Sequence, residues 1–150
     1  MRLSSIPKLA VALVAGLLIS GMAQAADTPA TLAGTKLVHA ADVAKVQSSG
    51  AVLIDSRVAA EYAEGHIKGA INVPYREKSE KVVTFDASQD EFNLAKLPAD
   101  KAAAIVIYCN GPECWKSFKA STVAIKGGYT NIYWYREGFP DWKSKSLPVE

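Results

Sequence analysis

The stretch IVIYCNGPECWKS, residues 105–117, decides the fold of this chain. Together with two preceding alanines it gives an apolar run over 103–108, which is typical of a parallel strand buried on both faces. The run leads directly into Cys109 and a loop that contains glycine and proline. The following residues, 115–126, are predicted to form a helix that ends at Gly127-Gly128. This order places Cys109 at the carboxyl end of a strand, where α/β sheets bind their ligands.

Similar short elements are predicted on both sides of this stretch. Apolar residues indicate strands over 51–54, 70–74 and 131–135, a strand that runs into a helix over 38–43, and helices over 59–63 and 139–145. Asp42 is the expected N-cap of the first helix. Residues 75–100 are polar and irregular, with one weak helical patch over 90–97. Short buried strands that alternate with helices predict the α/β class, with a parallel sheet flanked by helices on both faces.

The composition fits one globular domain. The chain has 150 residues, of which 49% are hydrophobic and 21% are charged, so disordered and collagen-like classes are excluded. The net charge is +2, and without Arg2 and Lys8, which lie in a predicted leader, 15 basic side chains balance 15 acidic ones. Nucleic-acid binding needs a clustered basic surface, which a neutral chain is not expected to present. Two cysteines, Cys109 and Cys114, are too few for a disulfide-framework scaffold.

Residues 1–25 have the pattern of a secretory signal peptide. Two basic residues precede an apolar run over 9–19, and Ala23-Gln24-Ala25 has the small-x-small pattern of a cleavage site. We therefore expect cleavage after Ala25 and export to the periplasm. A membrane span needs about 20 apolar residues, so no membrane association is expected after cleavage. Residues 26–35, which include Ala, Thr and Pro, are then expected to form a flexible N-terminal segment.

The loop that follows Cys109 is suited to covalent chemistry. Backbone N–H groups at the start of a helix have no intrahelical partner, and the helix dipole adds partial positive charge there. Such a cradle binds anions and lowers the pKa of a cysteine, which makes Cys109 a candidate thiolate nucleophile. The alternative is a buried structural cysteine at the end of a strand.

Three blocks of sequence resemble the hallmark segments of rhodanese-like domains. They are LIDSR at 53–57 with Glu61-Tyr62 and GHIKGAINVP at 65–74; IVIYC at 105–109 with Ser117, Ala120 and Gly128-Tyr129; and Asn131-Ile132-Tyr133 with Gly138, Trp142, Leu147 and Pro148. The blocks occur in the family's order and cover residues 36–150. The resemblance implies one rhodanese-like domain over this range, with a central five-stranded parallel sheet flanked by helices on both faces.

The same resemblance implies sulfur transfer through a cysteine persulfide. Cys109 matches the family nucleophile, which takes sulfane sulfur from thiosulfate, polysulfide or a persulfide and passes it to cyanide, a small thiol or a protein thiol. The implied activity is of the thiosulfate:cyanide sulfurtransferase type and needs no metal or organic cofactor. The loop expected to cradle the anionic persulfide consists of Asn110, Gly111, Pro112, Glu113, Cys114, Trp115, Lys116 and Ser117.

Two charged residues and a histidine match family positions near this loop. Asp55 and Arg57 either form an ion pair that braces the loop, or Arg57 faces the anionic substrate; the bracing role is favoured. His66 is either a general base for Cys109 or a turn histidine that hydrogen-bonds the backbone, and the turn role is favoured. His39 is given no functional role.

The loop departs from the family pattern in length and charge. Between Cys109 and Ser117 it is about two residues longer than usual and contains no arginine, so Lys116 is its nearest cation. Glu113 adds a negative charge, and lysine lacks the bidentate fork with which arginine holds an oxyanion. These changes argue against thiosulfate as the physiological donor. Trp115 stands where the related cysteine phosphatases carry an arginine, so phosphatase and arsenate reductase activities are not expected.

Cys114 and Trp115 each have two interpretations. As a resolving thiol, Cys114 would convert a Cys109 persulfide or sulfenate into a disulfide, as in a thiol–disulfide redox protein or a redox switch. Otherwise it is a small buried residue at a helix start. Trp115 either lines the substrate pocket or packs in the core.

Two further alternatives concern the protein as a whole. A non-catalytic binding module that keeps the rhodanese fold is the third functional hypothesis, beside the sulfurtransferase and the redox protein. A Cys-x4-Cys pair with only two histidines elsewhere is weak support for structural zinc, which generally takes four ligands, so no metal site is predicted.

Overall fold

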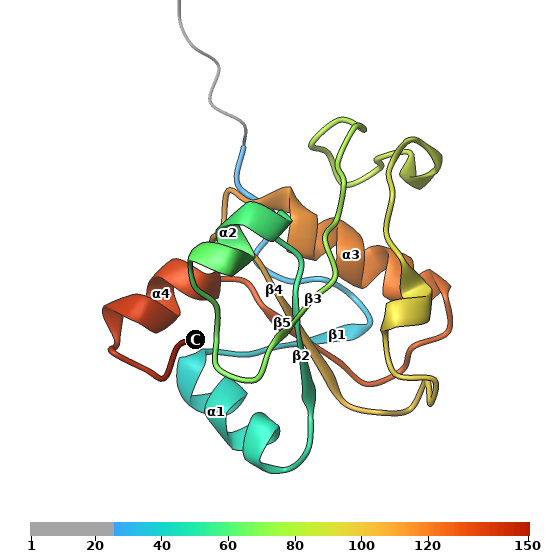
Figure 1. The fold of residues 1–150 in the computed structure, drawn as a ribbon. Coiled ribbons are helices and arrows are strands. Elements are labelled where there is room, and N and C mark those ends of the chain that lie inside the picture. The colour runs from blue at the N-terminus through green and yellow to red at the C-terminus, as the bar shows by residue number, and fades with distance from the viewer. Residues whose placement is uncertain (1–25) are drawn as a thin grey trace, which may run out of the picture.

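The sheet expected from the alternating pattern is formed by five parallel strands in the order β1-β5-β4-β2-β3 (Figure 1). This computed structural model describes residues 26–150, so the predicted signal peptide lies outside the described residues. The elements are β1 (Thr35–Leu37), α1 (Ala40–Ser48), β2 (Val52–Asp55), α2 (Ala59–Glu64), β3 (Ile71–Asn72), the 3-10 helices η1 (Ala87–Gln89) and η2 (Leu94–Lys96), β4 (Ile105–Tyr108), α3 (Trp115–Lys126), β5 (Ile132–Tyr135) and α4 (Gly138–Ser144). The expected five-stranded parallel α/β fold is confirmed.

Strand β4 occupies the centre of the sheet, and all its side chains are buried. Ile105 and Ile107 belong to the apolar cluster that includes α3, whereas Val106 and Tyr108 belong to the cluster that includes α1 and α4. A continuous apolar run can fill both faces in this way, because successive side chains of a strand point to opposite sides. Helices therefore cover both faces of the sheet, as expected.

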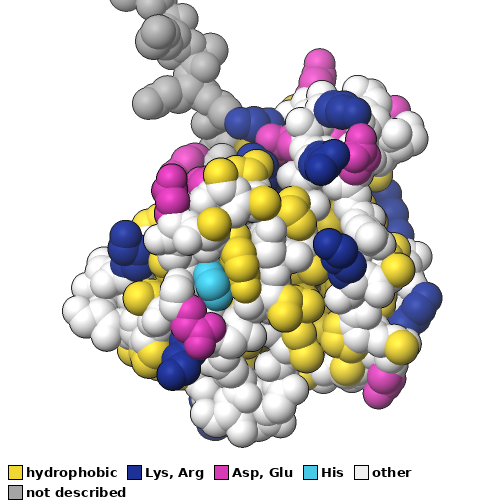
Figure 2. Space-filling model, viewed as in Figure 1, with side chains coloured by type: hydrophobic (Ala, Val, Ile, Leu, Met, Phe, Trp, Pro, Cys, Tyr) yellow, Lys and Arg dark blue, Asp and Glu magenta, His cyan; other side chains and the backbone are white. Residues whose placement is uncertain are grey.

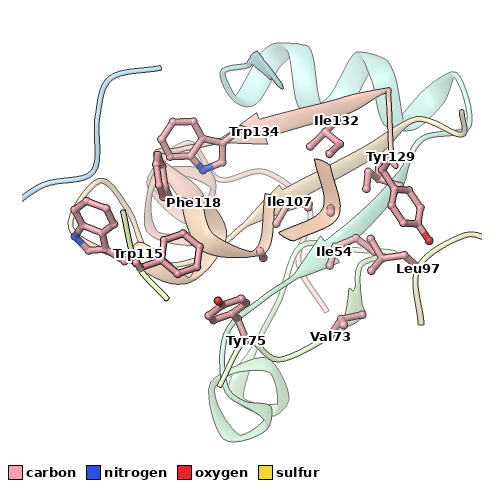
Figure 3. Packing of buried hydrophobic residues seen from close by; sticks show 14 residues of the cluster. Ile54, Val73, Tyr75, Leu97, Ile107, Trp115, Phe118, Tyr129, Ile132 and Trp134 are labelled. Atoms are coloured by element: carbon pink, nitrogen blue, oxygen red, sulfur yellow. The ribbon is translucent and has the colours of Figure 1, made fainter. Parts of the chain in front are cut away.

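Aromatic side chains concentrate at one end of the cluster beneath α3. Figure 3 shows Trp115, Phe118 and Trp134 close together, with Tyr129 and Leu97 at the opposite end of the same cluster. The Phe118 ring meets Trp115 at a centroid distance of 5.2 Å and Trp134 at 5.7 Å, both edge to face. Such pairs each add about 0.5–1.5 kcal/mol beyond burial of their area. The first turn of α3 is thus held firmly against the sheet.

The first helix begins earlier than the sequence suggests. Helix α1 starts at Ala40 with His39 as its N-cap, so the expected N-cap at Asp42 is wrong. Asp42 lies in the first turn instead, where its carboxylate accepts a hydrogen bond from the His39 N–H at 3.2 Å. An acidic side chain that bonds back to the N-cap N–H in this way is the acidic half of a capping box.

The helical patch predicted over 90–97 contains only the short helix η2. Asn93 caps it, because its side-chain oxygen accepts the Ala95 N–H at 3.1 Å, and Pro98 follows directly after its C-cap. Local side-chain bonds of this kind compete with a regular helix.

A buried lysine on α3 anchors the irregular segment 75–92. Lys119 is completely buried and donates to Ser79 Oγ at 2.8 Å and to the Ser79 carbonyl at 3.1 Å, while its Nζ lies 2.9 Å from Glu77 Oε2. Asp90 lies beside the same group and accepts hydrogen bonds from Ser79 N–H, Ser79 Oγ and Tyr75 Oη. This network joins the segment to the helix that carries the loop.

Strand β3 forms one edge of the sheet and is only two residues long. Apolar side chains are visible on the face of the molecule around this edge (Figure 2), and Val58 and Ile71 are each about two-fifths exposed, at 42% and 41%. A short edge offers few backbone groups for pairing with another chain. Over residues 26–150, no helix combines the length and apolar character needed to cross a membrane.

The Asp90 network predicts a pH dependence of stability. Burial acts to raise the pKa of Asp90, but hydrogen bonds from Ser79 and Tyr75 outweigh it and lower that pKa to about 2. The folded state therefore gains stability above the ordinary carboxyl pKa and loses it as the pH falls toward 2. Asp90→Asn should lower the free energy of unfolding at pH 7 by about 1–2 kcal/mol and flatten its acid dependence, measured by urea unfolding. Glu80→Gln, an exposed carboxylate of the same segment, is the control; equal acid slopes for both variants would refute the prediction.

Candidate active site

Cys109 follows β4 directly, at the edge where β2 also ends, with Asp55. The Cys109 side chain is fully buried, and its sulfur is bonded to that of Cys114 in a disulfide. The Cα atoms of the two cysteines are 6.4 Å apart, within the span of a disulfide. Cys114 is partly exposed and is the N-cap of α3. The second cysteine, for which the sequence allows two roles, therefore contacts the first directly.

Ser117 holds the Cys109 sulfur against the start of α3. Its backbone N–H donates to Cys109 Sγ at 3.3 Å, and its Oγ lies 3.2 Å from the same sulfur. Trp134 Nε1–H donates to Ser117 Oγ at 3.0 Å, which leaves the hydroxyl proton able to point toward the sulfur. A helix N-terminus carries partial positive charge, so this position suits a thiolate. Of the predicted cradle, the Ser117 N–H thus reaches the sulfur, whereas the Cys114 N–H bonds the Gly111 carbonyl at 3.0 Å.

The backbone of Cys109 is also held by the start of α4. Phe139 N–H donates to the Cys109 carbonyl at 2.9 Å. Gly138 has φ of 66°, in the left-handed region, and a Cβ added to it would overlap the Cys109 carbonyl oxygen. Glycine is therefore required here for two reasons, its backbone conformation and the close approach of the strand end.

Asp55 and Arg57 form a buried ion pair that supports the strand ends. Arg57 Nη2 lies 2.6 Å from Asp55 Oδ2 and donates to the Gly65 carbonyl at 2.7 Å, and the Tyr108 hydroxyl donates to Asp55 Oδ2 at 2.8 Å. Burial acts to lower the pKa of Arg57, but the hydrogen bond and charge of Asp55 outweigh it and raise that pKa. The guanidinium also lies 4.3 Å from the centre of the Phe139 ring. These contacts favour the bracing role over a role in facing substrate, and they act on Tyr108, the residue before the nucleophile candidate.

The two histidines lie away from the sulfur. His66 stacks on Tyr62 at a centroid distance of 3.7 Å, and its Nδ1 lies 3.0 Å from the Tyr62 carbonyl. Its backbone exchanges hydrogen bonds with Glu150 at the C-terminus. This is the turn role, not that of a general base for Cys109. His39 Nδ1 lies 2.6 Å from Glu137 Oε1.

The N-terminal segment covers the loop, which the expectation of a flexible lead-in over 26–35 does not anticipate. Thr28 is buried, and both its backbone N–H and its Oγ1 donate to the Pro112 carbonyl, at 2.8 and 2.7 Å. Arg136 donates to the Thr28 carbonyl at 2.7 Å and to Thr28 Oγ1 at 3.1 Å. Trp115 Nε1–H donates to the Ala26 carbonyl at 2.8 Å. Residues 26–28 thus form a strap over the loop that sequence patterns do not reveal, since its partners are 84 or more positions away.

Trp115 is a packing residue and not the wall of an open pocket. Its ring is buried against Phe118, and the strap covers its indole nitrogen. Of the remaining loop residues, Glu113 is exposed, while Lys116 and Pro112 are partly exposed. Asn110 Nδ2 donates to Glu61 Oε1 at 2.5 Å, which ties the loop to α2.

An open cleft of about 430 Å³ is lined by residues of α2 and α4. Its lining residues are Arg57, Glu61, Glu64, Gly65, Phe139, Pro140 and Lys143. Cys109 is not among them, so its sulfur does not line this cleft in the disulfide form. Within residues 26–150, no three His, Cys, Asp or Glu side chains gather as they would around a metal ion.

Comparison with known proteins identifies the class to which this arrangement belongs. A model of the rhodanese-like domain family matches residues 39–145. The BH2092 protein from Bacillus halodurans has the same fold, with a TM-score of 0.57, 25% identity and 77% of each chain covered. The thiosulfate sulfurtransferase from Pseudomonas aeruginosa is similar to this chain in fold, with a TM-score of 0.56 and 20% identity. The similarity covers 77% of this chain and 20% of that one. The chain belongs to the rhodanese-like domain family, as its sequence blocks suggest.

Relatives with known names include both enzymes and a regulator. The thiosulfate:glutathione sulfurtransferase of Saccharomyces cerevisiae is 32% identical over 93 residues, which cover 62% of this chain and 65% of the relative. Thiosulfate sulfurtransferase PspE of Escherichia coli is 32% identical over 79 residues, covering 53% of this chain and 62% of the relative. The HTH-type transcriptional regulator Rv0324 of Mycobacterium tuberculosis is 32% identical over 111 residues, covering 73% of this chain and 42% of the relative. The chain thus spans less than two thirds of the length of each.

The strap predicts how easily the disulfide is reduced. Thr28→Val removes the hydroxyl bonds to Pro112 and Arg136, each worth about 1 kcal/mol, so the loop should open more often and dithiothreitol should reduce the disulfide roughly thirtyfold faster. Thiol release can be followed by alkylation and mass spectrometry. Thr130→Val, which removes an exposed hydroxyl bond to Lys101, is the matched control. Equal reduction rates for the two variants would show that the strap does not guard the loop.

The ion pair at the strand ends predicts a large loss of stability. Asp55→Asn leaves the Arg57 guanidinium buried without its anionic partner and should lower the free energy of unfolding by about 3–5 kcal/mol, measured by urea unfolding. Glu91→Gln, which breaks the exposed pairs with Arg76 and Lys78, should change it little. Similar losses in the two variants would contradict the bracing role.

Proposed function

We propose that this protein is an exported sulfurtransferase that carries sulfane sulfur as a persulfide on Cys109. The observation that carries the proposal is the position of the Cys109 sulfur, which accepts the Ser117 N–H at the N-terminus of α3. The same chemistry is supported by the chain's membership of the rhodanese-like domain family and by two relatives that are named as sulfurtransferases. A sulfur held in this way is stabilised as a thiolate, and the thiolate is the nucleophile.

The reaction divides into two transfers. The Cys109 thiolate attacks the outer sulfur of the donor; a bond forms between the two sulfurs, and the donor's own bond to that sulfur breaks, with its electron pair leaving on sulfite, a thiolate or a shorter polysulfide. A nucleophilic acceptor, such as a thiol or cyanide, then attacks the terminal sulfur of the persulfide and the thiolate returns. Covalent catalysis in two half-reactions of this kind gives ping-pong kinetics.

The other site residues support this chemistry by positioning the Cys109 sulfur and the strand that carries it. Ser117 positions the Cys109 sulfur with its N–H and hydroxyl, and Trp134 orients that hydroxyl. Asp55 and Arg57 brace the strand end through Tyr108. The reaction begins from the reduced protein, because the Cys109 sulfur can attack a donor only after its bond to Cys114 is broken.

The charge of the loop favours polysulfides or persulfides over thiosulfate as donors. Lys116 is the cation of the loop, and Glu113 places a carboxylate in the same stretch. A thiosulfate dianion is bound best by a guanidinium, which the loop lacks. The signal-peptide pattern of residues 1–25 supports a periplasmic location for the mature protein, with cleavage after Ala25.

The bond between Cys109 and Cys114 favours a second candidate function, that of a thiol–disulfide redox protein. Such a protein would exchange its disulfide with partner thiols and would take up no sulfur. A non-catalytic binding module would do neither.

Sulfur loading of the reduced protein tests the proposal. After treatment with polysulfide under anaerobic conditions, Cys114→Ser should gain the mass of one sulfur atom, and cyanide should remove it as thiocyanate. Cys109→Ser should gain none at that position, because it lacks the nucleophile. Intact-mass spectrometry before and after cyanide measures both results. Loading of Cys109→Ser to the same extent would show that the nucleophile is assigned wrongly.

A further inference from the structure

We propose that Cys114 displaces the sulfane sulfur from the Cys109 persulfide by forming a disulfide with Cys109, so that the protein releases this sulfur as hydrosulfide. The inference rests on the proposed function, because it needs the Cys109 persulfide. It adds a reductive step: the two cysteines supply the electrons, and the product left on the protein is the Cys109–Cys114 disulfide.

The loop brings the two cysteines together without help from another element. Their Cα atoms are 6.4 Å apart, so a disulfide forms with the loop in the conformation it already has. The turn between them is closed by the Cys114 N–H, which donates to the Gly111 carbonyl at 3.0 Å, and Gly111 has φ of 121°. Few residues other than glycine adopt this backbone conformation. The loop, longer than the usual family loop, thus places a second sulfur at the first.

The two sulfurs differ in their surroundings, and the difference sets the direction of the chemistry. Cys109 is fully buried and its sulfur accepts the Ser117 N–H at 3.3 Å, whereas Cys114 is partly exposed at the helix N-cap. An external thiol therefore reaches Cys114 first. Attack there expels Cys109 as a thiolate, which Ser117 and the helix N-terminus stabilise. Reduction of the disulfide thus regenerates the nucleophile.

The resolving step balances without an outside oxidant. The Cys114 thiol, on losing its proton, attacks the Cys109 sulfur of the persulfide; the bond between the two cysteine sulfurs forms, and the bond to the terminal sulfur breaks. The terminal sulfur leaves with the electron pair and takes up the proton as hydrosulfide. Two electrons pass from the cysteine pair to the sulfane sulfur. A dithiol then reduces the disulfide, so the dithiol is the reductant for each further turnover.

The charges of the loop are consistent with departure of the terminal sulfur. Residues 109–117 carry one cation, Lys116, and one anion, Glu113, so their net charge is zero. An arginine in the loop would hold the terminal anionic sulfur with a bidentate pair of N–H groups. The loop has no arginine to retain the sulfur, and it has a second thiol that can displace it.

A single-turnover experiment tests the inference. The protein is reduced, freed of reductant under anaerobic conditions, and mixed with one equivalent of benzenethiosulfonate, which releases benzenesulfinate when its sulfur is transferred. The wild type should release one equivalent each of benzenesulfinate and hydrosulfide and should end two hydrogens lighter than the reduced protein. Cys114→Ser should release benzenesulfinate but no hydrosulfide, and should keep the sulfur until cyanide is added. Serine is also a good N-cap, so this variant preserves the start of α3.

The outcomes separate the two proposals. If the wild type releases benzenesulfinate but retains the sulfur, Cys114 does not displace the sulfur from Cys109, and the proposed function stands. Release of hydrosulfide by Cys114→Ser at the wild-type rate also overturns the inference. If neither the wild type nor Cys114→Ser releases benzenesulfinate or takes up sulfur, the proposed function itself fails, and the inference fails with it. Cys109→Ser controls for sulfur taken up elsewhere.

Discussion

The site depends on one constraint, the burial of β4 between two parallel neighbours. A strand that is apolar on both faces occupies the centre of the sheet, and parallel pairing brings the carboxyl ends of β2, β4 and β5 to the same edge. From there the chain returns along the opposite direction as α3, so the helix N-terminus lies at the strand end. The hydrogen bond from Ser117 to the Cys109 sulfur follows from this geometry.

Several cations near this edge are engaged in holding the structure together. Arg57 is committed to Asp55 and Gly65, Arg136 to the strap at Thr28, and Lys119 to the segment that carries Ser79. Each of these charges is satisfied by oxygen atoms of the protein, which lowers the cost of its burial. The sulfur itself lies against a backbone amide, a hydroxyl, the Cys114 carbonyl oxygen and a second sulfur. Positive charge at the sulfur therefore comes chiefly from the helix N-terminus.

The loop contains one buried and one partly exposed cysteine, and this difference in exposure gives the two sulfurs different chemical roles. In our proposals the inner sulfur is the nucleophile and the leaving group, and the outer sulfur meets thiols from solvent. On the proposed function, the disulfide and the persulfide are successive states of one loop. The strap at residues 26–28 bonds Pro112 and Trp115 and so covers the loop in the disulfide form.

The fold could be predicted from the sequence, because local patterns of apolar residues determine which faces of strands and helices are buried. The informative patterns were the apolar run before Cys109, the alternation of short strands with helices, and the family blocks. The family blocks also predicted that Asp55 and Arg57 lie near the loop. The Asp42 N-cap was predicted wrongly, because the capping residue depends on where the chain leaves β1. The contact of Cys114 with Cys109, the strap at Thr28, the Lys119 network and the turn role of His66 were decided by tertiary structure. Most of these contacts join residues far apart in the chain, and all depend on side-chain placement that only packing in three dimensions determines.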